Sequence, residues 1–154
     1  MSRKYKVIYG ISYPNLHHEG DQPIKISSNA QNREEFYNDP AIRLSSQDCE
    51  YFKNKDICLE HNENDKVGVI TDAWKDSDNH MRMTARIFVD TPRGELIYDN
   101  VKCGKLKGLS VGYSVPIDHN DEIIYKNCKE ISLCENPFFN GAEVKITASE
   151  RGFN

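Results

Sequence analysis

Two segments in which apolar residues alternate with other residues constrain the fold of this chain most. Residues 81–89 place apolar side chains at every second position: Met81, Met83, Ala85, Ile87 and Val89. Residues 109–115 repeat this pattern, but the positions in between hold only small residues, Ser110, Gly112 and Ser114. A period of two residues predicts β-strands with one buried face. The small residues on the other face of the second strand would leave space above the sheet for a substrate.

Shorter apolar runs predict further strands at residues 6–11, 24–26, 67–71, 123–125, 131–133 and 144–146. Short helices are expected at residues 34–37 and 46–52, the second with Ser45 as N-cap. A longer helix should begin at Thr91-Pro92 and stop at Gly104, with Leu96, Ile97 and Val101 on its apolar face. We therefore expect an α+β, mainly β fold, in which a few helices surround an antiparallel, barrel-like sheet.

Length and composition exclude several classes of protein. The 154 residues suit one domain, which we place at residues 1–148, followed by a short tail at 149–154. A net charge of -4 argues against a nucleic-acid partner. No apolar run approaches the roughly 20 residues that a membrane span requires. The five cysteines are irregularly spaced, which favours reduced thiols in an intracellular protein over a disulfide framework.

Three residues far apart in the sequence have the chemistry of nucleophilic acyl transfer. Ser110 lies on the small face of its predicted strand, His61 precedes it by 49 residues, and Glu130 follows it by 20. A serine needs a base to remove its proton, and a histidine base needs a third group to orient it and stabilise its charged form. These residue types occur in any chain of this length, so spacing alone leaves open the possibility that they are unrelated.

The segments around these residues resemble those of a known family. Residues 108–113, Gly-Leu-Ser-Val-Gly-Tyr, are similar to the nucleophile strand of viral capsid-maturation proteases, the superfamily of herpesvirus assemblins and tailed-phage prohead proteases. Residues 60–62 followed by 67–69 resemble its histidine segment, and residues 129–134 resemble its third segment. The resemblance covers about residues 57–146, with the first 55 residues matching only loosely.

The resemblance implies a serine endopeptidase that cleaves scaffold and capsid precursor proteins inside the assembling procapsid. Ser110 would be the nucleophile, His61 the general base and Glu130 the group that orients it. The family further implies a homodimer, no metal and no organic cofactor. The enzyme would act in the nucleus of the infected cell for a herpes-like virus, or in the cytoplasm for a phage.

The sequence departs from the assemblin pattern at two places. Assemblins have a second histidine at the position of the third catalytic residue. This chain has Glu130 there, and in this respect it is similar to the phage enzymes. Assemblins also form their oxyanion hole with an arginine pair, whereas this chain has Phe138-Phe139 in that region and no arginine until Arg151. Backbone N–H groups could replace the arginines. The alternative is a catalytically inactive assembly or scaffold module that retains the protease fold.

Residues 146–149, Ile-Thr-Ala-Ser, resemble the release site at which assemblins free themselves from a longer precursor. The bond between Ala148 and Ser149 is therefore a candidate self-cleavage site, and the chain would then be part of a precursor or uncleaved. The alternative is a last strand that leads into a frayed tail.

Two other roles for His61 are possible: a zinc ligand, or the base for a cysteine nucleophile. Cys58, His61, Cys128 and Cys134 supply zinc-type ligands, but their spacing does not match a zinc motif. Cys134 could also act as a nucleophile with His61, although we expect it to pack beside the site.

Overall fold

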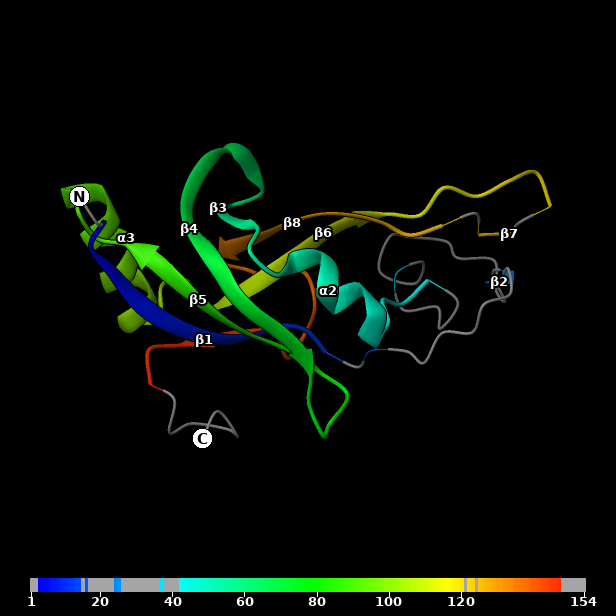
Figure 1. Ribbon diagram of the computed structural model, residues 1–154, viewed down its shortest axis with the longest axis horizontal. Helices are drawn as coiled ribbons and strands as arrows, with labels where there is room; N and C mark the ends of the chain where they lie inside the picture. The colour runs from blue at the N-terminus through cyan, green and yellow to red at the C-terminus, as the bar shows by residue number, and fades with distance from the viewer. Residues whose placement is uncertain are drawn as a thin grey trace.

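A curled sheet of seven strands forms the body of the protein (Figure 1). The computed structural model describes residues 3–14, 16, 24–25, 37, 42–120, 122–123 and 125–147. The strand order in the large sheet is β6-β8-β3-β4-β5-β1-β9. Its strands are β1 (Tyr5–Tyr13), β3 (Asp56–Leu59), β4 (Asn62–Lys75), β5 (Met81–Phe88), β6 (Gly108–Ser114), β8 (Asn127–Cys134) and β9 (Glu143–Lys145). A separate two-stranded sheet pairs β2 (Ile24–Lys25) with β7 (Glu122–Ile123).

The large sheet is mainly antiparallel, as the sequence predicted, but one of its strand pairs is parallel. The hairpin of β3 and β4 places β3 beside β8, and these two strands run in the same direction. The chain reaches β8 from β3 only after β4, β5, a helix, β6 and β7, and this long connection permits parallel pairing. The prediction had no strand at residues 56–59.

Glycines allow the two edges of the sheet to approach each other, which gives it the expected barrel-like curl. The backbone N–H of Val144 donates a hydrogen bond to the carbonyl oxygen of Lys107, 3.1 Å away, beside the edge strands β9 and β6. A Cβ atom at Gly108 of β6 would lie 3.1 Å from the backbone of Ala142, just before β9, and one at Gly10 of β1 would lie 2.6 Å from the side chain of Leu109 on β6. A larger residue at either position would force these strands apart.

The alternation in β5 and β6 builds much of the core. In β5 the side chains of Met81, Met83, Ala85 and Ile87 are buried, and in β6 those of Leu109, Val111 and Tyr113 are buried. Arg82 is buried as well, although the pattern places it on the outer face of β5. Its guanidinium forms an ion pair with Asp76, which compensates for the burial of its charge.

Two helical segments lie against the sheet. The 3₁₀ turn η1 (Ser46–Asp48) continues into α2 (Cys49–Phe52), and Ser45 and Asp48 form the predicted capping box. The longer helix α3 (Pro92–Lys102) begins after Thr91, whose side-chain oxygen accepts a hydrogen bond from the Gly94 N–H at 3.0 Å. The N-cap predictions are therefore confirmed.

The prediction for the apolar face of α3 is wrong at one position. Ile97 and Val101 are buried, but Leu96 is 59% exposed. Ile97 and Val101 lie four positions apart and therefore share one stripe of the helix, whereas Leu96 lies about 100° away from Ile97. The helix predicted at residues 34–37 lies outside the described residues except for Tyr37.

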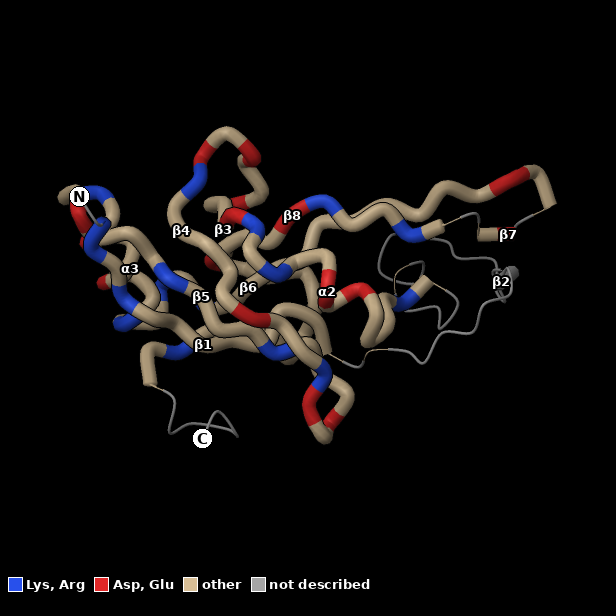
Figure 2. Tube along the Cα trace, viewed as in Figure 1, with Lys and Arg blue, Asp and Glu red and all other residues tan. Residues whose placement is uncertain are grey.

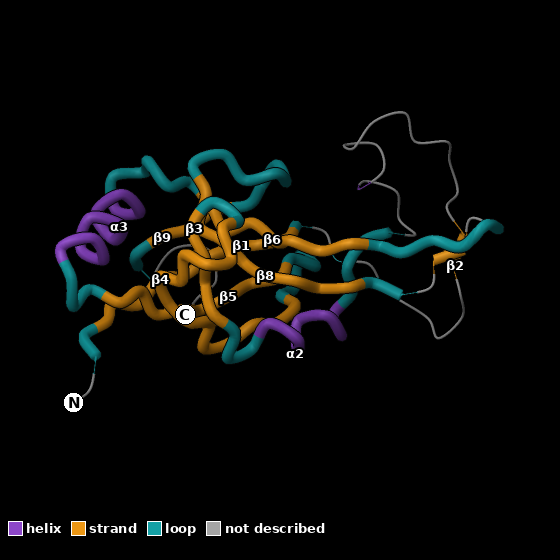
Figure 3. Tube along the Cα trace, turned by 90° about the horizontal axis from the view of Figure 1, so that it is seen from above, coloured by secondary structure: helices purple, strands orange, loops and turns teal. Residues whose placement is uncertain are grey.

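The described elements form an elongated molecule, with α3 near one end (Figure 3). Figure 3 shows α3 at one end of the sheet, while β6 and β8 run side by side toward the other end. Figure 2 shows basic and acidic residues interspersed over the described elements. In the part of the chain that the structure describes, no helix is long and apolar enough to cross a membrane.

Candidate active site

His61 lies in a tight turn between β3 and β4. Leu59 pairs with Asn62, so the hairpin loop consists of Glu60 and His61 alone. Both residues have positive φ angles, 51° and 61°, as type I′ hairpin turns require. Such turns usually contain Asn-Gly, because most side chains disfavour the left-handed conformation.

Hydrogen bonds to β8 and the residue after it hold this turn in place. The backbone N–H of Glu60 donates to the carbonyl oxygen of Leu133 at 2.9 Å. The Glu60 side chain accepts a hydrogen bond from the backbone N–H of Glu135 at 2.8 Å. The turn is therefore attached to β8 at Leu133 and to the residue that follows the strand, which fixes the position of His61 relative to β8.

The antiparallel pairing of β6 with β8 brings the other two residues into position. Ser110 lies opposite Ser132, and Gly112 lies opposite Glu130. A Cβ atom at position 112 would collide with the carboxylate of Glu130. The glycine in β6 therefore leaves the space in which this carboxylate lies.

The structure brings the three predicted residues into one hydrogen-bonded row. Nδ1 of His61 lies 2.5 Å from Oε1 of Glu130, and Nε2 lies 3.1 Å from Oγ of Ser110. Because a carboxylate can only accept, this arrangement assigns the ring proton to Nδ1 and leaves Nε2 to accept from the serine hydroxyl. The side chain of Glu130 is only 10% exposed, whereas that of His61 is 44% exposed. Solvent therefore reaches the imidazole from one side.

A hollow of about 230 Å³ adjoins this row of residues. Its wall includes His61 and Ser110 and an aromatic group made of Tyr37, Tyr113, Phe138 and Phe139. The ring centroids of Tyr37 and Phe138 are 5.7 Å apart, and those of Tyr37 and Tyr113 are 5.2 Å apart. The sequence marked Phe138-Phe139 as a departure from the assemblin pattern, but it did not predict this aromatic wall.

The tyrosines of this region are constrained by burial and hydrogen bonding. Burial raises the pKa of Tyr113 far above its usual range, so its phenol remains protonated. Its hydroxyl lies 3.3 Å from that of Tyr13 and donates to the carbonyl oxygen of Ile42 at 3.4 Å. Tyr113 is therefore suited to form a wall of the hollow and not to transfer protons.

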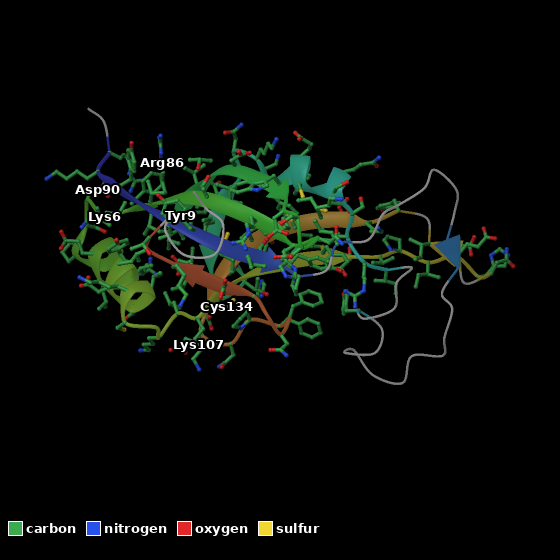
Figure 4. The ribbon with its side chains drawn as sticks, turned by 90° about the horizontal axis from the view of Figure 1, so that it is seen from below. Lys6, Tyr9, Arg86, Asp90, Lys107 and Cys134 are labelled. Carbon is green, nitrogen blue, oxygen red and sulfur yellow. The ribbon has the colours of Figure 1, made fainter. Side chains whose placement is uncertain are left out.

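The competing nucleophile, Cys134, is poorly suited to that role. Cys134 is buried, and burial together with the nearby Glu60 raises the pKa of its thiol to about 12. The thiolate that would attack a substrate is therefore scarce at neutral pH. The backbone of Cys134 is also paired: its carbonyl oxygen accepts the backbone N–H of Lys107 at 3.0 Å (both residues are labelled in Figure 4).

The alternative zinc ligands lie in different environments. The Cys128 thiol contacts Asp48, with 3.8 Å between sulfur and oxygen, and His61 contacts Ser110 and Glu130. All five cysteines are unpaired thiols. Within the described ranges, no group of three or more His, Cys, Asp or Glu residues is arranged to hold a metal ion. The candidate self-cleavage bond between Ala148 and Ser149 lies outside the described residues.

Comparison with known families identifies the chain. The family model of the caudovirus prohead serine proteases matches residues 34–152. The chain belongs to this family. The match confirms the predicted superfamily, and it begins upstream of the resemblance recognised at residues 57–146, so that it includes Tyr37 of the aromatic wall.

Solved structures of a herpesvirus protease share the fold of this prohead protease family member. A Kaposi's sarcoma-associated herpesvirus protease in complex with a hexapeptide phosphonate inhibitor is 17% identical with a TM-score of 0.53, and the match covers 92% of this chain and 64% of that one. A structure of that virus's protease with an allosteric inhibitor is 14% identical, with a TM-score of 0.51, and the match covers 90% and 73%. The chain thus spans less than two thirds of the first structure. No curated protein sequence matches it significantly.

Proposed function

We propose that this chain is a serine endopeptidase that cleaves scaffold and capsid precursor proteins during procapsid maturation. The observation that carries the proposal is the hydrogen-bonded row of Ser110, His61 and Glu130 beside an open hollow. Membership of the prohead serine protease family supports the same class of reaction.

In this proposal Ser110 attacks the scissile carbonyl carbon while Nε2 of His61 accepts the hydroxyl proton. The tetrahedral intermediate collapses when His61 donates this proton to the leaving amine, which leaves an ester on Ser110. A water molecule then attacks the ester, again with His61 as base, and releases the carboxylic acid product. Glu130 orients the imidazole and stabilises its positive charge through the bond at Nδ1.

The aromatic wall supports a preference for peptides with a large apolar side chain near the scissile bond. Aromatic rings offer a large apolar surface to such a side chain. Phe138 is 39% exposed and lies on the wall of the hollow that Ser110 also lines. The substrate side chain would cover this ring and remove it from water, which favours binding.

The finer parts of the proposal rest on the resemblance to assemblins and prohead proteases. They are self-release at the bond between Ala148 and Ser149, a homodimer as the active form, and action inside the procapsid of the infected cell. The alternative, a catalytically inactive assembly module, is favoured by the phenylalanines 138 and 139 at the place of the assemblin arginine pair.

Cleavage of a proteome-derived peptide library, read by mass spectrometry, tests the proposal. We expect new peptide ends for the wild type, with large apolar residues enriched near them, and none for Ser110→Ala or His61→Ala. No cleavage by a folded wild type, whether monomeric or in a salt that favours dimers, would support the assembly module instead. Cleavage that persists in Ser110→Ala would assign the reaction to another residue or to a contaminant.

A further inference from the structure

A fourth polar residue, Ser132, lies within the core of the candidate active site. It is on β8, directly opposite Ser110 of β6 and beside Cys58 of β3. Ser132 is fully buried. A buried hydroxyl is costly unless it is hydrogen-bonded, so its partners indicate what it does.

Both hydrogen-bonding capacities of this hydroxyl are directed at the proposed catalytic residues. Oγ of Ser132 donates to Oε2 of Glu130 at 2.7 Å. The same oxygen accepts the backbone N–H of His61 at 3.0 Å. One hydroxyl therefore connects the carboxylate to the backbone of the residue that this carboxylate orients.

The bond to Glu130 complements the bond that this carboxylate makes to the imidazole. Oε1 contacts Nδ1 of His61, and Oε2 is held by Ser132. With both oxygens occupied, the carboxylate cannot rotate without breaking a hydrogen bond. The plane in which Oε1 meets the imidazole is thereby fixed.

The bond to His61 acts on the backbone instead. His61 has a φ of 61°, in the left-handed region that residues other than glycine seldom occupy. Oγ of Ser132 accepts the backbone N–H of His61 in this conformation. In the same conformation the imidazole of His61 points toward Ser110. The same hydroxyl thus supports the orientation of the ring and the position of its backbone.

We propose that Ser132 is a positioning residue for the acid–base step, which keeps His61 and Glu130 in register with Ser110. The inference rests on the proposed function, because it assigns Ser132 a role in the same reaction. Ser132 touches neither substrate nor the reacting atoms, and acts only through its two neighbours. A merely structural serine would affect stability alone.

The test compares Ser132→Ala with Ser12→Ala, a matched control. Ser12 is also fully buried, but its hydroxyl lies on β1 and contacts the carbonyl oxygen of Met81 at 3.5 Å. The probe is an alkyl fluorophosphonate, for which the maximal inactivation rate kinact and the binding constant KI are measured separately. Thermal unfolding and amide hydrogen exchange of His61 are recorded for each variant.

We expect kinact of Ser132→Ala to fall about 10- to 100-fold, the range typical of groups that orient functional histidines in metal sites. KI should remain within about twofold, since the binding surface is unchanged, and the His61 amide should exchange faster. Ser12→Ala should lose stability without these changes. Ser132→Thr, which keeps the hydroxyl, should recover most of kinact.

Wild-type kinact and unchanged exchange of the His61 amide in a folded Ser132→Ala would overturn the proposal. Equal losses of kinact in Ser132→Ala and Ser12→Ala would also overturn it. If Ser132→Ala does not fold, Ser132→Cys, whose thiol is a weak donor, replaces it with the same expectations. If the wild type does not react at Ser110, the proposed function fails. The exchange rate of the His61 amide then tests by itself whether Ser132 holds the backbone of His61 in place.

Discussion

His61 has a left-handed backbone conformation that residues other than glycine seldom adopt. The left-handed region costs most residues about 1–2 kcal/mol, and Glu60 beside it lies in the same region. Backbone strain of this kind persists where the surroundings over-determine it, and it is often found at functional sites. Here the bonds from Glu60 and His61 to β8 compensate for the strain. The conformation directs the imidazole toward Ser110 and Glu130.

Glu130→Gln tests the orienting role of the carboxylate. The amide keeps the shape of the side chain but can donate to Nδ1, and so favours the wrong ring tautomer for accepting the Ser110 proton. We expect the rate of Ser110 labelling by a fluorophosphonate to fall about 10,000-fold, as for the equivalent change in other serine proteases. Glu63→Gln on β4, an exposed position, is the control and should keep the wild-type rate. A labelling rate within tenfold of wild type would contradict the role of Glu130.

The turn between β4 and β5 depends on a single carboxylate. Asp76 accepts hydrogen bonds from the backbone N–H groups of Asp78 at 2.8 Å and His80 at 2.9 Å. It also forms a largely buried ion pair with Arg82, at 2.5 Å. Burial alone would raise the pKa of Asp76, but the hydrogen bonds from His80, Arg82 and Asp78 outweigh it and lower this pKa below its ordinary value of 3.8.

Asp76→Asn should therefore destabilise the protein in a pH-dependent way. Removal of one partner from a buried ion pair leaves the other charge uncompensated, so we expect a loss of about 3 kcal/mol in the free energy of unfolding at pH 7. A carboxyl whose pKa is lower in the folded state stabilises the fold fully above its ordinary pKa, and this contribution disappears as the pH falls through the folded value. The difference between wild type and variant should thus shrink below about pH 4.

Urea unfolding at pH 7 and pH 3 measures this difference. Asp78→Asn is the control in the same turn, since Asp78 is exposed and offers the turn its backbone N–H. It should change the free energy of unfolding little at either pH. A loss in Asp76→Asn that is equally large at both pH values would show that charge is not the cause.

The aromatic wall is the element that should set substrate preference. Phe138→Ala removes an exposed ring that packs against Phe139, with 4.9 Å between ring centroids. We expect cleavage of peptides with a large apolar residue near the scissile bond to slow about tenfold or more. Labelling of Ser110 by a small fluorophosphonate should change little. Phe138→Leu, which keeps an apolar side chain, should retain most of the preference for large apolar residues. An unchanged cleavage profile in Phe138→Ala would show that the aromatic wall does not bind the substrate.

Across the whole molecule, the sequence predicted those elements whose signals are local. The alternation of residues 81–89 and 109–115 and the caps at Ser45 and Thr91 specify strands and helix starts within a few residues, and each was found. The strand β3 was missed because it is short and its turn lacks the Asn-Gly signal of a type I′ hairpin. The parallel pairing of β3 with β8 depends on long-range contacts, which no local pattern specifies.

In the candidate site, too, local sequence signals were found and features that depend on long-range contacts were missed. Resemblance and spacing singled out Ser110, His61 and Glu130, and the structure brings these three together. Ser132 was not predicted as a site residue, because its two hydrogen bonds arise from the register of β8 against the hairpin turn. The aromatic wall joins Tyr37 to residues about 100 positions later, which only the folded sheet brings together.

The intact mass of the protein after treatment with a fluorophosphonate tests the central claim most directly. The proposed mechanism predicts one adduct on the wild type, located at Ser110 by peptide mapping, and none on Ser110→Ala. Such a result requires a serine activated by its neighbours, since an ordinary hydroxyl does not react. The assignment of Ser110 as the nucleophile would be contradicted by a folded wild type that forms no adduct, either as a monomer or in a salt that favours dimers. An adduct that persists in Ser110→Ala would also contradict it.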